Sequence, residues 1–119
     1  MASKKSECIF CKIALKEIPA EIIYENNSFI SFPDVNPKVE GHTLIIPKKH
    51  FETCIDIPSS LGEELLDAIK NTAEIRIKQG ADGFNILQNN GKAAGQIVMH
   101  AHFHLLPIRN GGRKINLPF

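Results

Sequence analysis

Three histidines stand at alternate positions near the C-terminal end of the sequence, at His100, His102 and His104. Because side chains of a β-strand alternate between its faces, we expect these imidazoles on one face, about 6.5–7 Å apart along the strand. The apolar residues between them would point to the other face, which we expect to be the core. Such a row suits two kinds of chemistry. Imidazoles can converge on zinc, or one neutral imidazole can attack phosphorus while its neighbours orient it.

The loop before the histidines favours phosphate over metal at the central residue. It reads NNGKAAGQ, and no Asp or Glu occurs from Phe84 to the end of the sequence. Histidines that ligate a metal are commonly oriented by carboxylates, which this stretch does not supply. We expect Gly91 and Gly95 to leave backbone amides available, and Asn89 and Gln96 to add their side-chain amides. The loop therefore predicts a binding site for an anion.

The cysteines indicate a second kind of site. Cys8 and Cys11 form a C-x-x-C motif, and Cys54 is the third cysteine of the chain. An odd number of cysteines does not suit a disulfide framework. In a reducing compartment the motif indicates half of a metal site or a redox dithiol. Cys54 stands among apolar residues, and we expect it to be a small core residue.

The hydrophobic pattern predicts an antiparallel α+β domain with one long helix and a short N-terminal helix. The short helix is expected to end before Pro19, and the long helix to run from about Ser60 to Gln79. Ser60 and Glu63 fit a capping box at the start of the long helix. Strands are expected over residues 20–26, 29–34, 42–47, 83–88 and 97–107.

Length and charge predict an ordinary globular domain. The 119 residues suit a single domain over residues 1–119, with residues 1–6 as a disordered N-terminus and residues 108–119 as a C-terminal tail. The net charge of +1 gives no strong field to attract nucleic acid or an anionic membrane, and we expect neither as a partner. No apolar run is long enough to span a bilayer, and we expect a cytoplasmic protein.

Taken together, these stretches resemble a known family. The segment HAHFHLL fits the pattern His-φ-His-φ-His-φ-φ of the histidine triad (HIT) family, where φ is an apolar residue. The stretches ECIFCKIALKEIPAEIIYEN, FISFPDVNPKVEGHTLIIPKKH and ADGFNILQNNGKAAGQ resemble its Hint-like branch, in order and at similar spacing. The resemblance covers the chain from Glu7 to Pro107. It implies an antiparallel sheet with a long helix, assembled as a homodimer.

The resemblance also implies an activity. The expected reaction is hydrolysis, or transfer, at the α-phosphate of a purine nucleotide substrate, such as an adenosine 5′-phosphoramidate or a dinucleoside polyphosphate. His102 would attack phosphorus and form a nucleotidyl-histidine intermediate, from which water releases the nucleoside monophosphate. His104 would contact the phosphate or the leaving group, and His42 would support the geometry of the triad.

Other positions match the nucleotide contacts of the family. Asp34 would accept the ribose hydroxyls. Ile97 stands where many members have Ser or Thr, so a hydroxyl that could help the leaving group is missing, and Pro33 replaces a histidine of the nucleoside pocket. The expected phosphate contacts are Asn89, Gly95, Gln96 and Ile97, and the expected apolar slot for the base is Ile9, Phe10, Phe32 and Val35.

One subgroup of the family carries a C-x-x-C motif and binds structural zinc. The matching ligands here are Cys8, Cys11, His50 and His100, which would form a closed Cys2His2 site with one zinc ion per subunit. The zinc would hold His100 and leave His102 free to react.

Two other hypotheses stay open. The first is a zinc-stabilised purine nucleotide-binding module with little catalytic activity, and the residue that favours it is Ile97. The second is a metal hydrolase with zinc on all three histidines of the triad.

Overall fold

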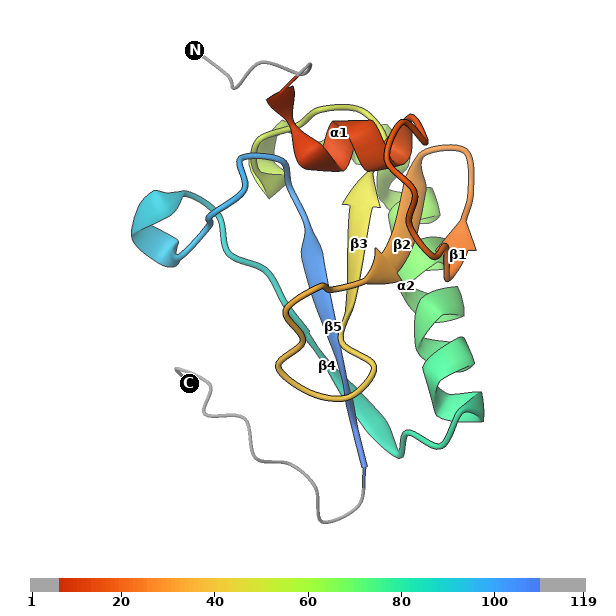
Figure 1. Cartoon of the computed structure of the whole chain (residues 1–119). Helices are drawn as coiled ribbons and strands as arrows, with labels where there is room; N and C mark the ends of the chain where they lie inside the picture. Colours follow the sequence, from red (N-terminus) through yellow and green to blue (C-terminus); the bar gives the residue numbers. More distant parts are fainter. Residues whose placement is uncertain (1–6, 110–119) are drawn as a thin grey trace.

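The computed structural model describes residues 7–109, which form a five-stranded antiparallel sheet with a helix against each face (Figure 1). The helices are α1 (Ile9–Ala14) and α2 (Gly62–Lys78). The strands are β1 (Tyr24–Glu25), β2 (Phe29–Pro33), β3 (Thr43–Pro47), β4 (Gly83–Leu87) and β5 (Phe103–Ile108), in the sheet order β1-β2-β3-β5-β4. The predicted α+β class, with one long helix and a short N-terminal one, is confirmed. The residues expected to be a disordered N-terminus, and all but the first two of the expected tail, lie outside the described residues.

The sheet is buried on both faces, which corrects one expectation. We expected the core only on the face opposite the histidines. Alternate residues of β2 and β3 pack instead against two helices, so Ile30 and Leu44 face α1 while Phe29 and Ile45 face α2. His104 pairs with Leu44 and therefore lies on the α1 side. Figure 1 shows α1 at the end of the sheet where β3 finishes, beside the chain that leads into β5.

The last strand begins later than predicted. We expected it over residues 97–107, but β5 begins at Phe103, so His100 and His102 precede it. By the register of the two strands, Pro47 of β3 stands opposite Ala101, but its carbonyl oxygen is bonded by the His100 side chain instead, Nε2 to O 2.8 Å. The Ala101 N–H bonds the Phe51 carbonyl at 2.6 Å instead of a strand neighbour. At its other end β5 includes Ile108, which we had assigned to the tail.

Two predictions about the helices and turns are wrong. The Ser60–Glu63 capping box is absent, because Ser59–Leu61 forms a 3-10 turn after Pro58, and the N-cap of α2 is Leu61 without a side-chain bond. A capping box occurs instead between Thr53 and Asp56, around the 3-10 turn Cys54–Asp56. Cys54 is exposed there and is not a core residue.

Strand β1 has only two residues, Tyr24 and Glu25, where we expected seven, because only these pair with β2. Among the residues 7–109, no helix is both long and apolar enough to cross a membrane.

Candidate active site and metal centre

A chain of hydrogen bonds fixes the protons of His42 and His104. The Lys38 backbone N–H donates to His42 Nδ1 at 3.0 Å, so the proton of the neutral ring is on Nε2. That Nε2 lies 2.9 Å from His104 Nδ1 and 3.3 Å from an Asp34 oxygen. Since His104 Nδ1 accepts this bond, the proton of His104 is on Nε2, where it can donate to an anion.

Both imidazoles of this pair are held neutral at pH 7. Burial, with smaller contributions from the neighbouring imidazoles of His102 and His42, lowers the pKa of His104 to about 4. Burial also lowers the pKa of His42, against the opposing effect of the Asp34 carboxylate. His104 is therefore a neutral hydrogen-bond donor in this structure.

His102 is oriented by its own backbone neighbour. Its Nδ1 lies 2.8 Å from the His100 carbonyl oxygen, and a carbonyl only accepts, so Nδ1 carries the proton. The lone pair is then on Nε2, the form that an imidazole nucleophile requires. The His102 ring packs edge-on against Phe10 and against His104, with ring centroids 5.1 Å apart in both cases.

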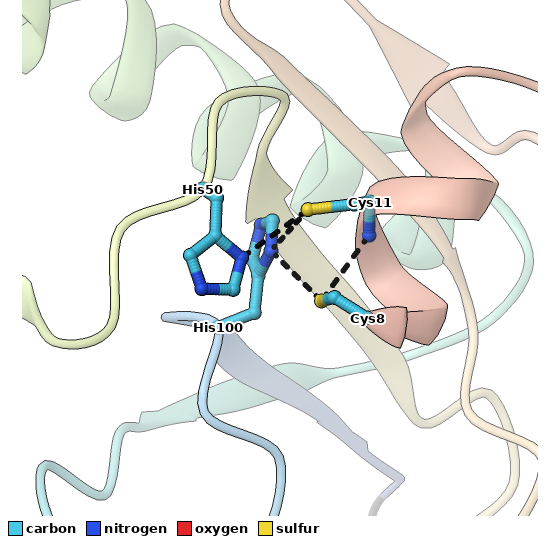
Figure 2. A group of neighbouring side chains, drawn as sticks. All are labelled: Cys8, Cys11, His50 and His100. Carbon is cyan, nitrogen blue, oxygen red and sulfur yellow. Dashed lines mark hydrogen bonds between the residues drawn. The ribbon is translucent and has the colours of Figure 1, made fainter. Parts of the chain in front are cut away.

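The four predicted metal ligands lie together, as Figure 2 shows. Cys8 Sγ lies 3.4 Å from His100 Nδ1, and Cys11 Sγ lies 3.5 Å from the same atom and 3.2 Å from His50 Nδ1. The four donor atoms all lie within 4.8 Å of one another. In a tetrahedral Cys2His2 zinc site, bond lengths place ligand atoms about 3.3–3.8 Å apart, so the donor set fits zinc.

Local structure presents these ligands. Cys8 is the N-cap of α1 and Cys11 stands in its first turn, so the two sulfurs point to the same side. His100 donates from Nε2 to the Pro47 carbonyl, which leaves its Nδ1 lone pair facing the sulfurs. Burial lowers the pKa of His100 to about 4, which keeps the ring unprotonated and able to ligate a metal.

The structure does not support one zinc held by all three histidines of the triad. Their Nδ1 atoms face three different partners, which are the sulfurs for His100, a carbonyl for His102 and His42 for His104. Within residues 7–109, no candidate cluster of metal ligands includes His102. A second cluster joins His104 with Asp34 and His42. It is a poor metal site, because Nε2 of His42 cannot ligate while Nδ1 accepts the Lys38 N–H.

The anion loop, residues 89–96, bends at its two glycines, but their N–H groups are not free as we expected: they donate to Gln96 Oε1 at 2.7 Å and to the Lys92 carbonyl at 3.0 Å. Gly91 and Gly95 have φ angles of 90° and 95°, on either side of the 3-10 turn Lys92–Ala94. The Asn89 side chain lies against Gly95, where a Cβ would be 3.5 Å from Asn89 Nδ2. Ile97, directly after the loop, is 90% exposed.

Gln96 does something that we did not expect. We predicted a direct phosphate contact, but its side chain is buried and binds the backbone of the protein. Its oxygen accepts the Gly91 N–H at 2.7 Å, and its nitrogen donates to the carbonyls of Glu52 and Val98 at 2.6 and 2.9 Å. Both amide hydrogens are therefore committed to carbonyl oxygens.

The predicted nucleoside contacts are divided between buried and exposed positions. Phe10 and Phe32 are buried and pack edge to face, with ring centroids 5.8 Å apart. Ile9 is half exposed and Val35 is 89% exposed, so in this structure Val35 packs against little. One oxygen of Asp34 accepts the Asn36 N–H at 2.9 Å, and the other faces His42.

Sequence reasoning missed the backbone groups that orient the histidines. These are the Lys38 N–H and the carbonyls of Pro47 and His100. Every residue has such groups, so no residue type in the sequence signals that they act here.

Comparison with known proteins gives a consistent family. The family model of the HIT domain matches residues 15–111. An uncharacterised HIT-like protein of Methanocaldococcus jannaschii is 44% identical over 108 residues, which are 91% of this chain and 84% of that protein. Adenosine 5′-monophosphoramidase HNT1 of Saccharomyces cerevisiae is 44% identical over 109 residues, which are 92% of this chain and 67% of the yeast protein.

Solved structures agree with the sequence comparison. The crystal structure of a HIT family member from Bacillus subtilis superposes with a TM-score of 0.85 at 36% identity, covering 95% of this chain and 81% of that one. The histidine triad nucleotide-binding protein from Candida albicans superposes with a TM-score of 0.81 at 37% identity, covering 95% and 84%.

Proposed function

Because this chain belongs to the HIT domain family, we propose that it hydrolyses purine nucleotide substrates at the α-phosphate, through a covalent nucleotidyl-histidine intermediate on His102. The substrate is an adenosine 5′-phosphoramidate or a dinucleoside polyphosphate, and the product is a nucleoside monophosphate. The name of the yeast relative, an adenosine 5′-monophosphoramidase, supports the first of these substrates. The observation that carries the proposal is the orientation of His102, with Nδ1–H on a carbonyl and the lone pair on Nε2.

The first step is attack by His102 Nε2 on phosphorus. A phosphorus–nitrogen bond forms, the bond from phosphorus to the leaving group breaks, and the leaving group takes a proton from solvent. His102 keeps its Nδ1 proton, so the phosphorylated ring is an imidazolium whose charge the His100 carbonyl stabilises. His104 donates from Nε2 to a phosphate oxygen or to the leaving group.

The second step is hydrolysis of the intermediate. Water attacks phosphorus, its oxygen forms the new bond, and the phosphorus–nitrogen bond breaks. Because the departing ring already carries its Nδ1 proton, it leaves as neutral imidazole and needs no further proton. One proton of the water stays on the product phosphate and the other passes to solvent, and the nucleotide is released as the monophosphate.

The proposed nucleotide lies across the face covered by α1. The anion loop, through Asn89, Gly95 and the backbone around Ile97, borders the phosphate. Asp34 accepts hydrogen bonds from the ribose hydroxyls. One of its oxygens must then give up its present partner, which is the Asn36 N–H or His42. The base slot is made of Phe10 and Phe32, which are buried, with Ile9 and Val35 at its rim.

We also assign structural zinc, one ion per subunit, to Cys8, Cys11, His50 and His100. When bound, zinc in such a closed four-ligand site supplies a structural link and no chemistry. The link joins α1 to the residue two positions before His102. A site with two thiolates also fits a protein of the reducing cytosol, where we place this one.

The proposed homodimer forms through β4. This strand is at the edge of the sheet, so its outer backbone groups are available to a second copy. Phe84 and Ile86 of β4 are 40% and 38% exposed, although both are large and apolar. Asn85 lies between them, and its side-chain nitrogen, Nδ2, is buried without a hydrogen-bond partner in the described chain.

Replacement of the proposed nucleophile tests the function. The variant His102→Ala should lose turnover of adenosine 5′-phosphoramidate by about 10⁴-fold or more, as expected when the attacking group is removed. Its zinc content and melting temperature should stay near those of the wild type, since His102 is not in the Cys/His cluster. Retained turnover would refute the assignment of the nucleophile.

A nucleotide-binding module is the second candidate, favoured by the exposed Ile97 in place of a hydroxyl residue. The two functions differ in the intermediate. Quenched reactions of the hydrolase should yield a protein mass increased by one nucleotidyl group, and this increase should be absent in His102→Ala. A module would bind nucleoside monophosphate tightly and show no mass increase.

A further inference from the structure

The anion loop is held to the rest of the protein by one buried side chain. Gln96 is 3% exposed, and its amide spans three backbone groups from three places in the chain. It bonds Gly91 within the loop, Val98 on the way to the triad, and Glu52 in a different segment. The backbone N–H of Gln96 also donates to the Gly91 carbonyl, at 3.1 Å, which closes the loop onto itself.

Through Glu52, Gln96 binds a segment that begins at His50, a predicted zinc ligand. We call residues 50–54 the brace. Besides the bond from Glu52 to Gln96, the Phe51 carbonyl accepts the Ala101 N–H at 2.6 Å, between two residues of the triad. At the far end of the brace, the Cys54 N–H donates to Asn90 Oδ1 at 2.8 Å. The brace thus joins the Cys/His cluster, the anion loop and the chain beside His102.

Gln suits this position for a chemical reason. The site presents one N–H and two carbonyl oxygens, so it needs one acceptor and two donors on the same side chain. A primary amide supplies that combination, whereas a carboxylate lacks the donors and an apolar side chain of equal length lacks all three. A side chain that binds phosphate would instead direct its N–H donors at the anion.

We propose that Gln96 is a positioning residue, which sets the anion loop against the brace and so fixes the loop's distance from His102. The inference rests on the proposed function, because the loop matters to catalysis only if it holds a phosphate there. Gln96 does not touch the substrate. It acts through the Gly91 backbone on one side and the Glu52 backbone on the other.

The variant Gln96→Met tests this proposal, because it keeps the length of the side chain and removes its three hydrogen bonds. We expect kcat for adenosine 5′-phosphoramidate to fall by about 10- to 100-fold, the cost of a misplaced reacting group. KM should change by less than about threefold, because contacts to the base and ribose are elsewhere. Hydrogen exchange of the Gly91 amide, followed by NMR, should accelerate.

Two further variants complete the test. Gln79→Met makes the same chemical change at the exposed end of α2, and it should leave kcat and Gly91 exchange at wild-type values. Asn90→Ala removes the exposed bond to the Cys54 N–H and should lower kcat by a few-fold. This variant also tests the link between the loop and the brace if Gln96→Met does not fold. A kcat within about twofold of wild type, or unchanged Gly91 exchange, in Gln96→Met would overturn the proposal. If Gln96→Met does not fold, a kcat within about twofold of wild type in Asn90→Ala would overturn it.

The proposed function fails in a different way. A wild-type protein that turns over no nucleotidyl substrate and traps no intermediate would refute the hydrolase. Gly91 exchange in Gln96→Met would then still decide whether Gln96 holds the loop, since that measurement requires no turnover.

Discussion

At the scale of single residues, the position of a proton distinguishes the histidines from one another. His42 accepts a backbone N–H at Nδ1 and must therefore donate from Nε2 to His104. His102 donates from Nδ1 and keeps a lone pair on Nε2. With His100, these four chemically identical side chains differ only in their partners, and the partners match the proposed roles of relay, donor, nucleophile and metal ligand.

The relay gives a testable prediction. His42→Leu removes the donor to His104 Nδ1, and we expect kcat to fall by about 10- to 100-fold, as for loss of a group that orients a functional histidine. His42→Gln places an amide donor near the position of Nε2 and should recover part of the loss. Nitrogen NMR of the His104 ring should report its Nε2–H form in wild type and a mixture of forms in His42→Leu. Equal kcat values in the two variants would exclude the relay.

The low pKa of His104 predicts how stability depends on pH. The unfolded imidazole takes up a proton near the usual histidine pKa of 6.5, whereas the folded one does so only near 4. Between these values the unfolded state binds more protons, so the free energy of unfolding should fall as the pH decreases from 6.5 toward 4. Urea unfolding at pH 7 and pH 5 measures the change. His104→Gln should show a weaker dependence on pH than wild type, and an identical dependence would contradict the assignment.

At the scale of elements, α1 is attached to the sheet by apolar packing and by the Cys/His cluster. The helix has only six residues, too few to be stable by itself, so its contacts must hold it in place. Phe10 packs against His100 and His102 at ring-centroid distances of 5.9 and 5.1 Å. The position of α1 therefore bears directly on the ring of the proposed nucleophile.

Loss of one thiolate should therefore release both the metal and the helix. For Cys8→Ser we expect zinc content to fall well below one ion per subunit, with a lower melting temperature and a lower kcat. Elemental analysis and calorimetry measure the first two effects. Cys54→Ser is the matched control, because Cys54 is exposed and outside the cluster, and it should change neither. A wild-type melting temperature that a chelator leaves unchanged would argue against structural zinc.

At the scale of the whole molecule, the exposed edge of β4 carries the proposed dimer. Ile86→Lys puts a charge on this edge strand and should convert a dimer into monomers, because an edge lysine opposes strand addition. Sedimentation velocity of both proteins measures the change. Ile55→Lys is the control, since Ile55 is 90% exposed on the 3-10 turn Cys54–Asp56, which is not part of β4, and this variant should remain dimeric. A monomeric wild type would contradict the proposed assembly.

Several features of this protein followed from the sequence alone. Hydrophobic periodicity predicted the two helices and the approximate places of the strands, because burial selects apolar side chains at the period of each element. The triad pattern indicated the HIT family, which the comparisons confirm. The resemblance to the zinc-binding subgroup implied a cluster of two cysteines and two histidines, which the structure brings together.

Other features were decided only by the tertiary structure. Residues 97–102 have the composition of a strand, but the Pro47 carbonyl is bonded by the His100 side chain and the Ala101 N–H by the Phe51 carbonyl, so the strand begins at Phe103. Gln96 was expected to bind phosphate, yet in the fold its amide meets Glu52, which is 44 residues away in the sequence. The sequence determined which chemical groups are present. Which proton each imidazole carries, and what each amide binds, depended on backbone groups that only folding brings within hydrogen-bonding distance.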